Sequence, residues 1–383
     1  MWKKGLSLTL ILNIFIFSNM SFAATATAKK VTTTKIPLPK LKTFTVSAWV
    51  PYWRAASGTE EIIKNINKVD IISPFSFEMT ETGTFKDPMK LDKEPYKSMI
   101  DVARKNKKLI VPSILWWAEG DMRESMDFVL RDADLRSAVI YDIKDVIKKY
   151  NLDGIDIDFE NKKAESKDVF TKFLTELSAE MHRSGKLLVC TIEARTPIDS
   201  KYTTVTAEVL KNVQYANDFK AIGKVCDQVR IMAYDQANDD KQLNASRGEG
   251  YKPVADIDWV EKVLTLAMRD IEWKKIIVGV PTYGYKYEVI RDTTGKITKY
   301  SRIGSMNWFY ADELAKELKI TPTRHVSGEL NYTYKKDGKE YLVWYSDAES
   351  IKQKVTLAKL YKIGGIAIFK IDGNNDQNIW KNL

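Results

Sequence analysis

Short apolar segments alternate with amphipathic helical segments over most of this chain, and this alternation constrains its fold more than any other feature. Eight such strands over about 340 residues match a (β/α)8 TIM barrel, an α/β fold, in count and length. A doubly wound sheet would favour a glycine-rich phosphate loop after the first strand, and VPYWRAASG is not one. The expected strands are Phe44–Val50, Asp70–Phe77, Lys108–Leu115, Leu152–Glu160, Leu187–Glu193, Gln228–Tyr234, Ile276–Tyr283 and Gly365–Lys370. The clearest helical patterns are Met122–Lys149, Lys163–Arg183 and Asp258–Ile271.

The alternation is interrupted between the seventh and eighth expected strands, over residues 284–345. This stretch contains strand-like pieces around one expected helix, Asn307–Leu318. Its KKDGKE sequence lies between tyrosine-rich runs and indicates a β-hairpin. We therefore expect a small α+β subdomain inserted into a barrel domain that spans residues 43–383.

The first 23 residues have the pattern of a secretory signal peptide. Two lysines precede an apolar run from Leu6 to Phe17, which is too short to span a bilayer. Residues 24–42 are rich in Thr, Lys and Pro, and we expect them to form a flexible leader. The sequence thus predicts a secreted protein, extracellular or periplasmic, with no membrane span after cleavage.

Charge and composition limit the classes of partner. The formal net charge is +9, or +7 once the two lysines of the signal peptide are removed, which favours anionic surfaces such as cell walls but is equally compatible with simple solubility. No basic cluster interleaved with aromatic residues predicts nucleic-acid binding. Cys190 and Cys226 lie in or beside expected strands, so two buried thiols are at least as plausible as a disulfide. Only two histidines are present in the chain, so we expect no metal site. We also expect no cofactor, and we expect a monomer.

The fourth expected strand carries acidic residues at alternate positions in the sequence DGIDIDFE, residues 153–160. Successive side chains of a strand point to opposite faces, so Asp156, Asp158 and Glu160 share one face and an apolar set shares the other. Crowded carboxyls raise one another's pKa, and a general acid that works near neutral pH needs a raised pKa. A divalent-metal site and a solvated edge strand are the alternatives.

This run also resembles the DxxDxDxE signature of glycoside hydrolase family 18 at all four acidic positions, with Asp153 as the first. The sixth strand ends VRIMAYDQ and is similar to the MxYD motif of that family, at Met232, Tyr234 and Asp235. The resemblance implies a (β/α)8 enzyme that hydrolyses β-linked N-acetylglucosamine polymers, chitin or peptidoglycan, with retention. The alternative is a non-catalytic carbohydrate-binding barrel. Family members of that kind commonly lose one of these acids, whereas all of them are present here.

The resemblance assigns a role to each catalytic residue. It implies that Glu160 protonates the glycosidic oxygen and that the 2-acetamido carbonyl of the substrate attacks C1, because the usual carboxylate nucleophile is absent in this family. Asp158 would orient the acetamido group, Asp156 would hold Asp158, and Tyr234 would donate a hydrogen bond to the acetamido oxygen. Asp153, Met232 and Asp235 are placed with the substrate-binding residues.

Two strands depart from the family pattern. In the eighth strand, Phe369 stands where members usually have a tryptophan below the sugar. In the third, Ser113-Ile114-Leu115-Trp116 replaces the usual SxGG, and Trp117 follows. Aromatic residues also gather at other strand ends, where sugar rings could pack on them: Tyr52, Trp53, Trp116, Trp117 and Tyr283.

Arg230 shares the strand parity of Met232, so it could point into the barrel. A guanidinium there needs a carboxylate partner. Asp153, Asp156 and Glu193 are candidates, and exposure to solvent is the alternative.

Overall fold

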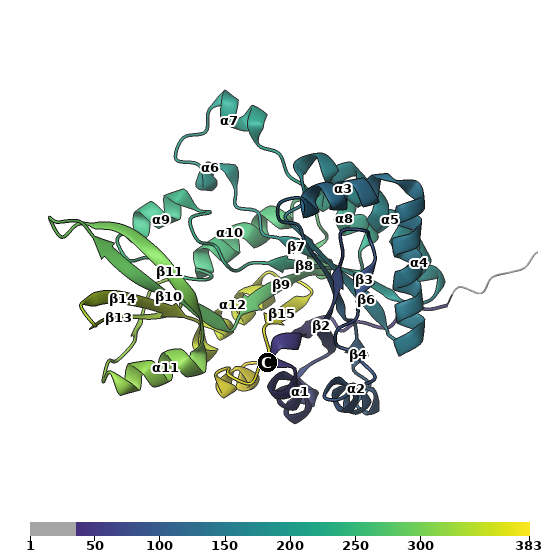
Figure 1. Cartoon of the computed structure of the whole chain (residues 1–383), viewed down its shortest axis with the longest axis horizontal. Helices are drawn as coiled ribbons and strands as arrows, with labels where there is room; N and C mark the ends of the chain where they lie inside the picture. Colours follow the sequence, from purple (N-terminus) through teal and green to yellow (C-terminus); the bar gives the residue numbers. More distant parts are fainter. Residues whose placement is uncertain (1–35) are drawn as a thin grey trace, which may run out of the picture. The chain divides into compact units, whose positions relative to one another are not determined.

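The computed structural model describes residues 36–383, and the predicted signal peptide lies outside them. The eight expected barrel strands all form and close into one parallel sheet, in which β15 pairs with both β1 and β9 (Figure 1). The TIM barrel predicted from the sequence is confirmed. The barrel strands are β1 (Thr45–Pro51), β2 (Ile71–Met79), β5 (Ser113–Trp117), β6 (Gly154–Glu160), β7 (Leu187–Glu193), β8 (Gln228–Met232), β9 (Ile276–Pro281) and β15 (Gly365–Phe369); two short strands, β3 (Phe85–Lys86) and β4 (Leu109–Ile110), pair with β2.

The helices cover the outside of the barrel, and the large apolar core lies between them and the sheet. The long pattern Met122–Lys149 forms two helices rather than one, because Asp132 is extended and its side chain accepts hydrogen bonds from the first N–H groups of the second helix. Within residues 36–383, no helix is both long enough and apolar enough to cross a membrane. The helices are α1 (Ala55–Lys64), α2 (Tyr96–Lys105), α3 (Met122–Arg131), α4 (Ala133–Tyr150), α5 (Lys167–Arg183), α6 (Ile198–Lys201), α7 (Ala207–Asn212), α8 (Phe219–Val225), α9 (Lys241–Arg247), α10 (Ile257–Ala267), α11 (Trp308–Glu317) and α12 (Ala348–Leu360).

The insertion between the seventh and eighth barrel strands forms a separate antiparallel sheet with α11 packed on it (Figure 1). The KKDGKE turn is the predicted hairpin, with positive φ at both Asp337 and Gly338, as a type I′ turn requires. Glu329 joins this subdomain to the barrel, because its carboxylate accepts hydrogen bonds from the backbone N–H groups of Val254 and Ala255. The strands are β10 (Tyr283–Arg291), β11 (Ile297–Asn307), β12 (Thr323–Arg324), β13 (Leu330–Lys336) and β14 (Lys339–Tyr345).

Residues 36–42 differ from the flexible leader predicted for residues 24–42. Leu38 and Leu41 pack against apolar residues at the N-terminal ends of the barrel strands, including Ile71 and Leu187. Lys42 also forms an ion pair of 2.6 Å with Asp70. The two leucines supply enough apolar surface for this packing, although the composition of the stretch as a whole is polar.

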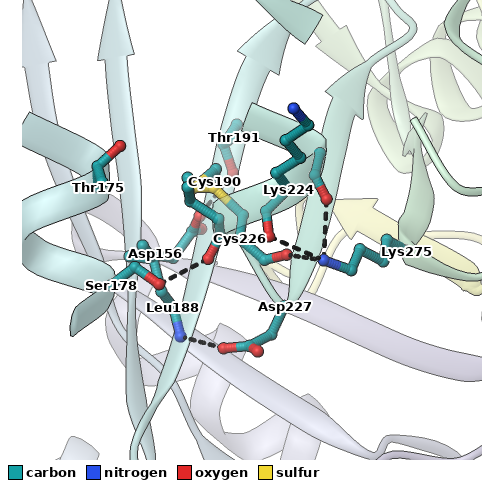
Figure 2. The surroundings of a disulfide bond; sticks show 12 residues. Asp156, Thr175, Ser178, Leu188, Cys190, Thr191, Lys224, Cys226, Asp227 and Lys275 are labelled. Atoms are coloured by element: carbon teal, nitrogen blue, oxygen red, sulfur yellow. Dashed lines mark hydrogen bonds between the residues drawn. A yellow bond between two sulfur atoms is a disulfide. The ribbon is translucent and has the colours of Figure 1, made fainter. Parts of the chain in front are cut away.

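The two cysteines form a buried disulfide, which decides between the two alternatives left by the sequence (Figure 2). Cys190 lies in β7, and Cys226 lies just before β8, where Lys275 donates hydrogen bonds to the carbonyl oxygens of Gly223 and Cys226. Asp227 accepts a hydrogen bond of 2.8 Å from the backbone N–H of Leu188. The bridge and these contacts fix the start of β8 against β7.

Candidate active site

Strand β6 carries its acidic residues into the barrel at three successive inward-facing positions. Its first residue, Gly154, lies so close to β7 that a Cβ atom there would come within 2.4 Å of the Leu187 carbonyl oxygen. Glycine therefore permits the tight β6–β7 pairing. The apolar residues of the opposite face, such as Ile157 and Phe159, are fully buried under the helices. This packing fixes the direction in which the acids point.

Asp156 lies deepest and is saturated with hydrogen bonds. One carboxylate oxygen, Oδ2, accepts from Trp49 Nε1 (3.1 Å), Ser113 Oγ (2.7 Å) and Arg230 Nη1 (2.9 Å). The other, Oδ1, accepts from Thr191 Oγ1 (2.7 Å). Three neutral donors and the fully buried cation Arg230 therefore hold the Asp156 carboxylate in place.

Arg230 is the inward-facing residue that the strand parity indicated, and Asp156 is its carboxylate partner. Both side chains are fully buried. Burial lowers the pKa of Arg230, and the charge of Asp156 opposes that shift. The guanidinium also lies over the ring of Trp49, with 4.9 Å between Cζ and the ring centroid. The pair forms the polar floor below the other two acids.

Asp158 and Glu160 have raised pKa values. Burial is the largest cause for Asp158, followed by the charges of Glu160 and Asp156, so the pKa of Asp158 lies well above its ordinary value. Within residues 36–383, its Oδ1 atom is buried without a hydrogen-bond partner. For Glu160, burial and the charge of Glu193 raise the pKa to about 7. A carboxyl with this pKa is protonated in much of the population at neutral pH.

Glu193 and Lys162 form an ion pair beside Glu160 that sequence reasoning did not assign to the site. The Lys162 ammonium lies 3.4 Å from the Glu193 carboxylate and contacts the Phe159 carbonyl oxygen. Glu193 also accepts hydrogen bonds from Asn161 N (2.9 Å) and Asn217 Nδ2 (2.6 Å). Lys162 and these donors outweigh burial, which alone would raise the pKa of Glu193, and the net pKa is lowered. The position of Glu193 in the sequence could have indicated its role, because Glu193 ends β7 as Glu160 ends β6.

The end of β8 contributes a buried tyrosine and an aspartate held by two further tyrosines. Burial, then the charges of Asp158 and Glu160, raise the pKa of Tyr234 well above its ordinary value, so its hydroxyl keeps its proton. Asp235 has a positive φ of 57° and accepts hydrogen bonds from Tyr283 (2.8 Å) and Tyr285 (2.5 Å). The inserted subdomain thereby reaches the barrel rim through β10.

A cavity of about 630 Å³ opens above these residues. Phe369 forms part of its wall and stacks on Tyr234, with ring centroids 5.4 Å apart. Trp117 also lines it and is 46% exposed, so a flat apolar ring is available to a sugar. The predicted site residues that line this cavity are Asp158, Glu160, Met232, Tyr234, Asp235, Trp117 and Phe369.

Two predicted substrate-binding residues lie elsewhere. Asp153 precedes β6 at the opposite end of the barrel, where its carboxylate accepts a hydrogen bond from Ile110 N (2.8 Å). Trp116 is fully buried on the outer face of β5 and packs edge-on against Phe159 at 5.2 Å. The strand register explains why Trp116 does not line the cavity. Trp116 pairs with the outward-facing Phe159 and Trp117 with the inward-facing Glu160, so only the side chain of Trp117 points into the barrel.

Three predicted aromatic residues lie next to the cavity rather than in its wall. Trp53 is 48% exposed and contacts Phe75, a wall residue, at 5.9 Å between centroids. Tyr52 packs on Trp53, and Tyr283 supports Asp235. Sequence reasoning also missed wall residues from the loops after β7 and β8, where no motif marks them: Lys201, Gln236, Ala237, Asn238 and Asp239.

A TIM barrel with a row of carboxyls at the C-terminal end of one strand, one of them with a pKa near neutrality, below an aromatic-lined cavity, is typical of glycosidases. The model of "Glycosyl hydrolases family 18" matches residues 48–374. The chain belongs to that family.

Two of the similar proteins come from Bacillus species. A cortical fragment-lytic enzyme of Bacillus cereus is 26% identical over 316 residues, 81% of this chain and 66% of that protein. A glycosylase of Bacillus subtilis, YvbX, is 27% identical over 61% of each chain. The chain thus spans less than two thirds of the length of these relatives.

Solved structures share the fold. The spore cortex-lytic enzyme SleL of Bacillus cereus superposes with a TM-score of 0.70 at 22% identity, over 91% of this chain and 74% of that one. A chitinase from Chromobacterium violaceum gives 0.71 at 19% identity, over 88% and 97%.

Proposed function

We propose that this protein is a secreted hydrolase of β-linked N-acetylglucosamine polymers that acts with retention through substrate assistance. The observation that carries this proposal is the raised pKa of Glu160, about 7, at the end of a strand whose other two inward-facing acids, Asp156 and Asp158, are buried in the barrel. Chitin and peptidoglycan both contain N-acetylglucosamine, and the relatives' names include enzymes of both kinds.

In the first step, Glu160 gives its proton to the glycosidic oxygen while the acetamido carbonyl oxygen of the same sugar attacks C1. The bond from C1 to the leaving oxygen breaks, and a cyclic oxazolinium ion forms. Asp158 accepts a hydrogen bond from the acetamido N–H and stabilises the positive charge that develops there. Its unpartnered Oδ1 atom is an acceptor free for this contact.

Asp156 and Tyr234 position these groups. Asp156 is held by Arg230 and three neutral donors, and its charge is one cause of the raised pKa of Asp158 beside it. Tyr234 keeps its proton and donates a hydrogen bond to the acetamido oxygen, as a buried phenol with a raised pKa can.

In the second step, the ionised Glu160 takes a proton from water, and the water oxygen attacks C1. The oxazolinium ring opens, the acetamido group is restored and the product retains the β configuration. The same carboxyl therefore acts first as an acid and then as a base, which a pKa close to neutral pH permits in both directions.

The test is Glu160→Gln with chito-oligosaccharides and purified peptidoglycan as substrates. We expect turnover to fall by about 10²–10⁴ or more, because the proton donor is lost, while oligosaccharide binding persists. Proton NMR of the first wild-type product should show the β-anomer. Wild-type turnover in the variant, or an initial α-anomer, would contradict the proposal.

A further inference from the structure

A second cavity of about 470 Å³ adjoins the catalytic one and shares two wall residues with it, Glu193 and Ala194. It begins at Asn161 and Lys162, directly after Glu160, and extends to the segment before α8. Beyond it, a further hollow of about 520 Å³ is lined partly by the same residues. A substrate group attached near the scissile bond on the Glu160 side would enter this space, which we call the Arg195 cavity.

Arg195 is the charged residue among the wall residues that both hollows share. Its guanidinium lies between two aromatic rings, with its Cζ atom 3.7 Å from the Tyr215 centroid and 4.0 Å from that of Phe219. Nη2 donates to the Asn217 carbonyl oxygen at 2.8 Å. The rings fix the plane of the guanidinium, which is part of the cavity wall, and a planar fork held in this way is suited to a carboxylate.

The charge around Arg195 is not neutralised by a direct partner. Among residues 36–383, no carboxylate lies within ion-pair distance of its guanidinium, whereas Lys162 pairs with Glu193 and Lys163 with Glu124. Asp218 and Asp270 influence Arg195 from farther away. Asp218 is already engaged, because its side chain accepts a hydrogen bond from Ala221 N at the start of α8. Burial lowers the pKa of Arg195, which is the cost of a cation kept in a cavity without a partner.

The catalytic cavity has the opposite character. Its wall carries Asp158, Glu160, Glu193, Asp235 and Asp239, with Lys201 as its cation. A neutral sugar backbone can occupy that space, but a carboxylate is repelled from it. The wall of the Arg195 cavity carries Arg123, Lys162, Lys163 and Arg195 against Glu165 and Glu193, so a carboxylate-bearing substituent is better accommodated there than in the catalytic cavity.

We propose that Arg195 binds a carboxylate carried by the glycan, so that the preferred substrate is an N-acetylated glycan with acidic substituents rather than neutral chitin. The inference rests on the proposed function and deepens it. The carboxylate could belong to a lactyl ether on the sugar or to a peptide attached to that ether. Both present the same group to the guanidinium.

The experiment compares four substrates with the full chain: a chito-oligosaccharide, a glycan fragment with free lactyl carboxylates, a peptide-substituted fragment, and that fragment with its carboxylates amidated. We expect a lower KM for the carboxylate forms, and Arg195→Gln should raise that KM about tenfold while kcat changes little. For the chito-oligosaccharide and the amidated fragment, the variant should match the wild type. Lys211→Gln, which removes an exposed charge outside the cavity, is the matched control.

Each outcome decides a different point. A preference for the lactyl fragment identifies the ether carboxylate, and a preference for the peptide-substituted fragment alone identifies the peptide. Equal kinetics for the acidic and amidated fragments would overturn the inference but leave the proposed function intact. Should no substrate be cleaved, the proposed function fails, and binding of the acidic and amidated fragments to Glu160→Gln still tests Arg195. Should Arg195→Gln not fold, Arg195→Lys keeps the charge without the planar fork, and the amide comparison on the wild type needs no variant.

Discussion

Replacing Glu193 with glutamine should lower the pKa of Glu160 without removing any catalytic group. Glu193 carries a negative charge, because its own pKa is lowered, and that charge raises the pKa of Glu160. The change is nearly isosteric. Asn217 can adapt to it, because among the described residues its buried Oδ1 atom has no hydrogen-bond partner and a flipped amide could accept from the new side chain.

The size of the shift follows from the sheet. Asp158 pairs with Thr191, so Glu160 and Glu193 are the next inward-facing neighbours on adjacent strands. With strands about 4.8 Å apart, we take a separation on the order of 7 Å for the carboxyl groups of two such long side chains. Two unit charges at that distance interact by about 2 kcal/mol at an effective dielectric constant of 20, or about 1.5 pKa units. Lys162 remains in the variant and still lowers the pKa of Glu160, so we expect a decrease of about one unit or more from about 7.

The assay is the pH dependence of kcat/KM on a soluble oligosaccharide. Because Glu160 must be protonated to act as the acid, its pKa sets the alkaline limb of the profile, and that limb should move about one unit to lower pH. Glu165→Gln is the matched control. It removes an exposed carboxylate from the segment that follows β6 and should leave the alkaline limb in place. The alkaline limb could instead stay fixed, or move to higher pH, in an active and folded Glu193→Gln protein. Either result would refute the conclusion that the charge of Glu193 raises the pKa of Glu160.

Two further predictions concern the buried groups below and beside the site. Arg230→Met should lower the free energy of unfolding by about 3–5 kcal/mol in urea titrations, because it removes one partner of a fully buried ion pair; a loss below about 1 kcal/mol would show that this pair does not stabilise the fold. Replacing both cysteines with alanine should cost about 2–4 kcal/mol, since the disulfide joins residues 36 apart in sequence, and should leave kcat unchanged because the bridge lies outside the cavity wall; an unchanged melting curve would show that the bridge adds nothing to stability.

The barrel could be predicted because its strands are marked by local composition, and strand bounds such as Leu187–Glu193 agree with the structure residue for residue. Two predicted site residues lie elsewhere for different reasons. Trp116 faces the other side of its strand, and Asp153 lies at the other end of the barrel. Trp116 and Trp117 are adjacent, and only their register against β6 determines which one faces the cavity. Asp153 belongs to the same acidic run as Glu160, yet it lies at the other end of the barrel. A motif supplies the set of residues but not the position of each.

The roles of the acids, in contrast, depend on cations that are distant in sequence. Asp156 is paired with Arg230, which lies two strands away and reaches it through the barrel interior. Glu193 is kept as an anion by Lys162, which comes from the loop after β6. Asp158 and Glu160 have no cation of their own in ion-pair distance among the described residues, and theirs are the pKa values that burial and neighbouring charge raise. The acid that can exchange a proton is thus selected by which carboxyls lack a cation. The alternating DGIDIDFE pattern, which treats all its acids alike, could not make that selection.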